Sequence, residues 1–72
     1  MISYAYRNLN TQASIIEKAK ELFELEIIDE PNGTRLGNDK ILIDVEEKVT
    51  RIIVYDISVN IKKLRQYIMG NK

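Results

Sequence analysis

The segment "PNGTRLGNDK", residues 31–40, is the stretch whose residue types most resemble a ligand-binding loop. A glycine-rich loop can aim backbone amides at a phosphate, and its full pattern is G-x-x-x-x-G-K-[ST] leading into a helix. Here only three residues separate Gly33 from Gly37, Asn38 stands where the lysine is needed, and a strand-like sequence follows. We therefore interpret this segment as a connecting loop, with one turn at Asn32–Gly33 and a second at Gly37–Asn38.

Nucleophilic and metal chemistry have few candidate residues in this chain. The sequence contains no Cys and no His, so disulfides, the usual zinc, haem and iron–sulfur ligands, and a histidine base for a serine nucleophile are all absent. Lys20 and Lys40 are the remaining candidate bases, and neither has a recognisable partner. We predict that the protein is not an enzyme, and we expect no catalytic residue, no cofactor and no metal.

An acidic group, Glu17, Glu21 and Glu24, lies on one outward face of an expected helix. Two carboxylates four residues apart could bind Ca²⁺ or Mg²⁺, or act as acid and base. Lysines are interleaved with them, and Lys20 stands four residues before Glu24, so a solvated face is the better interpretation. The excess of acidic residues over 17–30 makes this group a candidate contact for a basic partner.

Every charged residue after Asp56 is basic, and these residues are Lys62, Lys63, Arg65 and Lys72. Such a group could follow a nucleic-acid backbone, and it is a candidate contact for nucleic acid or for an acidic protein. The alternative is structural, because cations near the C-terminal end of a helix offset its dipole.

Two helices are expected. Apolar residues recur at helical spacing after the candidate N-caps Asn10 and Thr11, which predicts a helix over about 11–24. A second helix is predicted over about 57–69, capped by Asp56 or Ser58 and closed by Gly70. Its apolar face would consist of Ile57, Ile61, Leu64 and Ile68.

Between the helices, a hairpin of strands over about 40–46 and 49–55 is the strongest structural prediction. With a turn at Glu47–Lys48, one face is apolar and an opposite-charge pair lies on the other. The facing pairs are Val45 with Thr50, Ile43 with Ile52, Ile41 with Val54, Asp44 with Arg51 and Leu42 with Ile53. Two further extended segments are expected, over residues 2–7 and 25–30. In the first, Ile2, Tyr4 and Tyr6 lie on one face.

These elements predict a single small α+β domain over 1–72, with a small antiparallel sheet and both helices packed on its Ile41, Ile43 and Val45 face. The other face carries the candidate dimer residues Leu42, Val49, Ile53 and Tyr55. Contact with a second copy, ordinary exposure, and cover by the N-terminal strand or its tyrosines Tyr4 and Tyr6 are the alternatives for this face.

The overall composition indicates a protein that works by contact. Eleven basic and eleven acidic residues balance, no apolar run reaches the length of a membrane span, and no signal peptide is recognisable, so we expect a cytoplasmic protein. A chain of 72 residues buries little surface, which favours a homodimer. We predict a small protein-interaction module: a regulator, inhibitor or accessory subunit. The alternative is a nucleic-acid-binding accessory protein that uses the basic C-terminal helix. The twelve isoleucines and many lysines and asparagines are typical of an AT-rich bacterial or phage genome.

Overall fold

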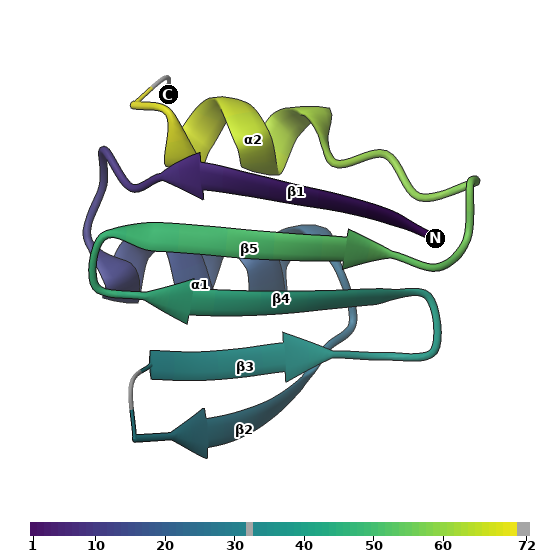
Figure 1. Ribbon diagram of the computed structural model, residues 1–72, viewed down its shortest axis with the longest axis horizontal. Coiled ribbons are helices and arrows are strands. Elements are labelled where there is room, and N and C mark those ends of the chain that lie inside the picture. Colours follow the sequence, from purple (N-terminus) through teal and green to yellow (C-terminus); the bar gives the residue numbers. More distant parts are fainter. Residues whose placement is uncertain (32, 71–72) are drawn as a thin grey trace.

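Residues 1–31 and 33–70, which a computed structural model describes, form a five-stranded antiparallel sheet with two helices on one face (Figure 1). The sheet order is β1-β5-β4-β3-β2. This confirms the predicted α+β fold with two helices on one side of an antiparallel sheet. The elements are β1 (Ile2–Arg7), α1 (Gln12–Leu22), β2 (Glu26–Glu30), β3 (Gly33–Gly37), β4 (Ile41–Glu46), β5 (Val49–Val54) and α2 (Lys62–Ile68).

The central hairpin has the predicted register. Ile43 lies opposite Ile52, Asp44 lies opposite Arg51, and the other three predicted pairs are also present. Alternation of apolar and polar residues selects this register, because a slip of one residue would turn every apolar side chain to the other face. The hairpin thereby defines a helix-covered face and an opposite face of the whole sheet.

Strand β3 corrects the prediction that residues 31–40 are a connecting loop. Gly33–Gly37 pairs with β4 on one side and β2 on the other. Its three central residues alternate, with Leu36 buried beneath the helices and Arg35 on the opposite face. The turn at Gly37–Asn38 is present, since the Asn38 side chain accepts hydrogen bonds from the Lys40 and Ile41 amides. The other predicted turn includes Asn32, which lies outside the described residues.

The hydrophobic core lies between the sheet and the helices. Its sheet layer is built from alternate residues of β3, β4 and β5, and its helix layer from Ile15, Ala19, Leu64 and Ile68. Complete burial of an aliphatic side chain contributes about 1.5–3 kcal/mol, so this layer supplies the main favourable term for folding. The sheet residues of the core are Leu36, Ile41, Ile43, Val45, Ile52 and Val54.

Helix α1 begins as predicted. Thr11 is its N-cap, and the Thr11 hydroxyl accepts a hydrogen bond from the Ser14 amide at 3.2 Å. The helix ends at Leu22 with Phe23 as its C-cap, close to the predicted end. The chain then leads into β2, so the extended segment predicted after the helix is a strand of the sheet.

Helix α2 begins at Lys62 rather than near residue 57, which corrects both its start and its cap. The Asp56 carboxylate accepts from the Ser58 amide, and the Asn60 side chain accepts from the Lys62 amide. These two local bonds hold the backbone in turns and compete with helix formation. Ile57 consequently is 93% exposed and does not belong to the apolar face of the helix. Gly70 closes the helix with a φ of +92°, as predicted.

Strand β1 lies at the other end of the sheet and contacts helix α2. Tyr4 lies opposite Ile52 and Tyr6 opposite Thr50, so both tyrosines are on the helix-covered face, where their rings stack. They therefore do not cover the opposite face, and β1 extends the sheet instead of covering it. After β1, the Leu9 amide donates to the Ile68 carbonyl at 2.8 Å, which satisfies one terminal carbonyl of α2.

Candidate interaction surfaces

The side of the sheet without helices, here called the open face, is not covered by any element in the described part of the chain (Figure 1). Three of the four candidate dimer residues, Leu42, Val49 and Ile53, are half-buried on it. The fourth, Tyr55, just past the end of β5, is 49% exposed. Leu42 and Ile53 are cross-strand partners, and Val49 lies nearer the β4–β5 turn. The fold thus brings the predicted dimer residues to one side of the sheet.

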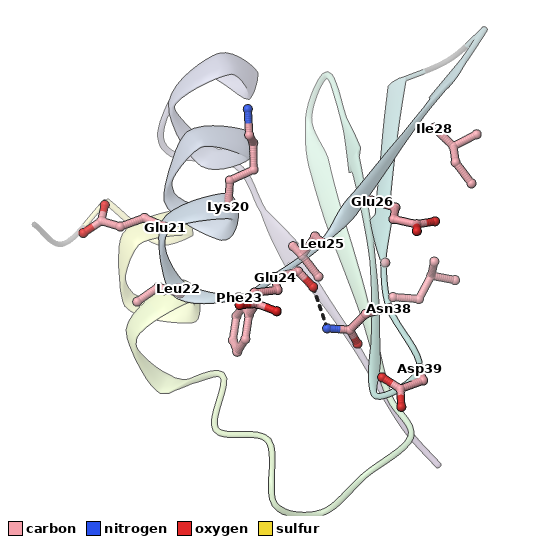
Figure 2. Close-up of a pocket in the computed structure, with 12 residues that line it drawn as sticks. Lys20, Glu21, Leu22, Phe23, Glu24, Leu25, Glu26, Ile28, Asn38 and Asp39 are labelled. Atoms are coloured by element: carbon pink, nitrogen blue, oxygen red, sulfur yellow. Dashed lines mark hydrogen bonds between the residues drawn. The ribbon is translucent and has the colours of Figure 1, made fainter.

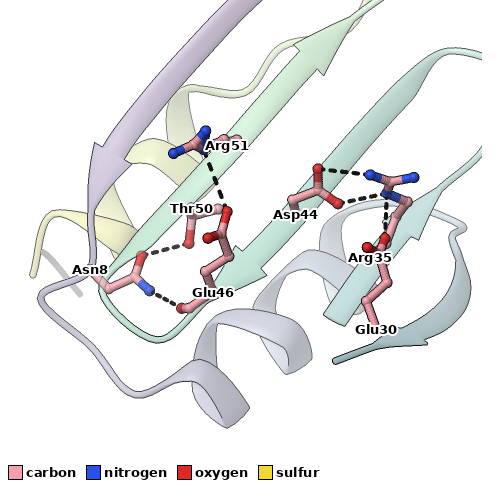
Figure 3. Close-up of polar contacts among 7 residues, drawn as sticks. All are labelled: Asn8, Glu30, Arg35, Asp44, Glu46, Thr50 and Arg51. Carbon is pink, nitrogen blue, oxygen red and sulfur yellow. Dashed lines mark hydrogen bonds and ion pairs between the residues drawn. The ribbon is translucent and has the colours of Figure 1, made fainter. Parts of the chain in front are cut away.

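Ion pairs occupy the middle of the open face (Figure 3). Arg35 on β3 contacts Asp44 at 2.7 Å and Glu30 at 2.8 Å, bridging three strands. The hydrogen bond to Asp44 and the charges of Asp44 and Glu30 raise the pKa of Arg35, so its guanidinium stays charged. These contacts pair the Arg35 charge with two carboxylates, so the group keeps one net negative charge beside the apolar residues.

A second ion pair on the open face departs from the sequence-based expectation. Asp44 and Arg51 lie opposite each other, but Arg51 pairs with Glu46 at 3.4 Å. Asp44 instead pairs with Arg35, which β3 places directly opposite it on the other side. The prediction of a loop over residues 31–40 places no strand next to β4 on this side, so the sequence does not indicate Arg35 as a competitor for Asp44.

Asn8 forms a polar cluster where β1 meets the β4–β5 turn (Figure 3). Its side-chain amide donates to the Glu46 carbonyl at 2.7 Å, and its oxygen accepts from the Thr50 hydroxyl at 2.6 Å. Thr50 is the one buried polar residue of the described chain, so this bond satisfies a hydroxyl enclosed by the core. The sequence contains no local signal for this cluster, because Asn8 and Thr50 are 42 residues apart.

An open pocket of about 890 Å³ lies where α1 leads into β2 (Figure 2). We call it the acidic pocket, because four carboxylates and one lysine lie among its apolar lining residues. The Asn38 side chain donates to the Glu24 carbonyl at 2.8 Å and ties the two sides together. The lining residues are Lys20, Glu21, Leu22, Phe23, Glu24, Leu25, Glu26, Ile28, Gly37, Asn38, Asp39 and Leu42.

The predicted acidic group is divided by this geometry. Glu21 and Glu24 line the acidic pocket, whereas Glu17 does not. On α1, Glu17 pairs with Lys20 at 3.6 Å and Glu21 with Lys18 at 3.7 Å, so Lys20 faces Glu17 rather than Glu24. Such exposed pairs contribute about 0–1 kcal/mol each, which fits a solvated helix face.

The predicted basic group is exposed on a short helix. Lys62, Lys63 and Arg65 are all exposed and form no ion pair with a described residue. Lys72 lies outside the described residues. The Lys18 ammonium group of α1 lies 5.7 Å from the centre of the Tyr67 ring. Tyr67 is the one aromatic residue of α2, and this cation–π contact already engages its ring.

Neither a metal-ligand group nor a membrane-spanning helix is found over residues 1–31 and 33–70. No group of three or more Asp or Glu side chains there could hold a metal ion. Neither α1 nor α2 is long and apolar enough to cross a bilayer.

Fold and surfaces together define a small α+β protein with one helix-covered sheet face, one open sheet face and an acidic pocket at the β2 side. Comparisons with protein-family models, with curated proteins and with solved structures found no match to this chain.

Proposed function

We propose that this protein is a non-enzymatic protein-interaction module that forms a homodimer through the open face of its sheet. The observation that carries this proposal is the one-sided cover of the sheet, which leaves Leu42, Val49 and Ile53 on a face without helices. Leu42 and Ile53 are neighbours across two strands there, and a group of apolar side chains on an uncovered sheet face is typical of an interface.

The electrostatics of the open face favour a second copy as its partner. Arg35 and Arg51 are already paired with carboxylates of the same chain, so two such faces can approach without a large charge conflict. A standard interface buries about 800 Å² per partner, about one sixth of the 4988 Å² surface of this chain. For a chain this small, that burial would add substantially to a marginal stability.

Within this proposal, the dimer acts in the cytoplasm of a bacterial or phage-infected cell as a regulator, inhibitor or accessory subunit. The lack of Cys and His in the sequence supports a role in contact rather than in catalysis. Dimer formation would present the acidic pocket and the basic helix in duplicate.

Sedimentation velocity of the wild type and two variants tests the homodimer. Ile53→Lys puts a charge into the proposed interface, and the matched control Ile57→Lys makes the same change at a side chain that is 93% exposed. We expect the wild type and the control to sediment as dimers at micromolar concentration, and Ile53→Lys as a folded monomer. A monomeric wild type contradicts the homodimer.

A nucleic-acid contact through α2 is the second candidate function, favoured by the exposure of Lys62, Lys63 and Arg65. NMR titration with duplex and single-stranded oligonucleotides at low salt tests it. Binding would shift the α2 amides, disappear on adding salt and be lost in Lys62→Glu with Lys63→Glu. The matched control is Lys40→Glu with Lys48→Glu, which changes the net charge equally in two loops.

A further inference from the structure

Strand β2 leaves one edge of the sheet unpaired. In the described part of the chain it pairs with β3 alone, and all five of its residues are exposed. The strand at the other end, β1, contacts α2 and has two half-buried tyrosines (Figure 1). An unpaired edge presents backbone N–H and C=O groups that can bond to another extended chain.

The side chains of β2 suit an added strand. Ile27 and Ile28 are 45% and 57% exposed and project to opposite sides of the sheet, so a neighbouring strand would cover part of each. Carboxylates flank them at Glu26, Asp29 and Glu30. Of these three, Glu30 is paired with Arg35, and neither Glu26 nor Asp29 forms an ion pair with another described residue.

The charge of this edge selects the kind of partner. A second copy would bring three more carboxylates along the same seam, and like charges across neighbouring strands are destabilising. Glu26 also lines the acidic pocket, whose lining residues include Glu24 and Asp39 near the start of β2 (Figure 2). A basic strand would instead find a carboxylate opposite each of its cations.

We infer that β2 accepts a basic, extended segment of another protein as a sixth, antiparallel strand. Backbone hydrogen bonds along the edge supply affinity, and the carboxylates on both sides of Ile27 and Ile28 supply selectivity. The antiparallel direction follows from its more stable hydrogen-bond geometry. This inference rests on the proposed role in protein contact, and it is independent of the homodimer.

A synthetic peptide tests the added strand on the wild-type protein. Its core, Lys-Lys-Val-Val-Lys, places lysine opposite Glu30, Asp29 and Glu26 and valine opposite both isoleucines. We expect shifts in β2 and β3 amides and slower hydrogen exchange at the edge-facing amides of β2. A peptide N-methylated on its edge-facing amides should bind at least about tenfold more weakly, because it cannot form the ladder. Equal binding of the methylated peptide would overturn the inference.

Charge exchange supplies the second test. Glu26→Lys with Asp29→Lys should weaken binding of the lysine peptide at least about tenfold and allow binding of the same peptide with glutamate in place of lysine. The matched control, Glu17→Lys with Glu47→Lys, has the same net charge and leaves β2 intact, so it should bind as the wild type does. Equal weakening in both variants would show general electrostatic attraction and contradict a site on β2.

The outcomes separate this inference from the homodimer. If the wild type sediments as a monomer but still binds the lysine peptide at β2, only the homodimer proposal is contradicted. A dimer lost in Ile53→Lys, together with a peptide that shifts no β2 amide, overturns the added strand alone.

Discussion

Asn8 joins three parts of the chain through one side chain. It bonds to the Glu46 carbonyl and to the buried Thr50 hydroxyl, and so holds the end of β1 against the β4–β5 turn. A buried polar group contributes little while it is paired and costs much when it is not. The cluster is therefore a position where a small change has a large effect on stability.

We predict that Asn8→Ala lowers the free energy of unfolding by about 1–3 kcal/mol, because it leaves the Thr50 hydroxyl without a partner. Urea unfolding measures the change. Thr50→Val serves as the second arm of a double-mutant cycle, and its cost should be smaller in the Asn8→Ala background than in the wild type. Strictly additive effects would show that the Asn8–Thr50 bond does not contribute.

The ionisation of Asp56 makes the stability of the folded protein depend on pH. Hydrogen bonds from the Ser58 backbone and side chain lower its pKa in the folded protein. The unfolded chain has an ordinary value of about 3.9. Its stabilising contribution is therefore fully present above about pH 4 and is lost as the pH falls through the lower, folded pKa.

We predict that the stability of the wild type falls with acidification in this range and that Asp56→Asn falls less steeply. The asparagine side chain can still accept the Ser58 amide hydrogen bond, so the variant removes the titration and keeps the turn. Urea unfolding between neutral pH and pH 3 measures both slopes. Identical slopes would mean that Asp56 titrates normally in the folded state.

Strand β3 depends on the absence of a side chain at its first residue. A Cβ at Gly33 would collide with the backbone carbonyl of Val45 on β4, whereas a Cβ at Gly37 would lie 2.9 Å from the flexible end of Leu42. The first neighbour belongs to the central strand and cannot move without displacing the sheet. The second can change its rotamer.

We predict that Gly33→Ala lowers the free energy of unfolding by about 1–3 kcal/mol and that Gly37→Ala costs less. Both variants add a methyl group to the same strand, so the difference between them reports how much harder the Val45 carbonyl is to displace than the Leu42 side chain. Urea unfolding of the two proteins side by side measures it. A larger decrease in the free energy of unfolding for Gly37→Ala would contradict a tighter contact at Gly33 than at Gly37.

Burial and strand pairing are unevenly distributed over the whole molecule. β4 and β5 have strands on both sides and buried residues at alternate positions, whereas β2 is exposed along its length. Local opening requires the least free energy where few apolar contacts are lost. We therefore expect the sheet to open first at β2 and last at the central strands β4 and β5.

We predict that the slowest amides of β2 exchange at least about a hundredfold faster than the slowest amides of β4. Amide-resolved hydrogen exchange measures both strands in one sample. Equal protection at all protein concentrations would mean that the β2 edge is covered, and it would contradict an edge free to accept a peptide.

Local pattern was sufficient for a large part of this fold. The β4–β5 register, a helix cap at Asn10 or Thr11, the closure of α2 by Gly70 and the strand over residues 2–7 follow from neighbouring residues. Each depends on interactions a few residues apart, or on an alternation that only one pairing satisfies. The candidate dimer residues followed from the same alternation.

The remaining features arose from contacts between segments distant in sequence. Gly33–Gly37 has turn-forming ends and only three side chains between them, and it is a strand because β4 offers it an edge. The partner of Asp44, the cover over Thr50 and the exposed edge at β2 likewise depend on which strands become neighbours. Residue spacing specifies which side of a strand each side chain faces. Which strand becomes its neighbour is determined by packing across the whole sheet. The free energy of burying both sides of a strand is gained only when the complete sheet forms.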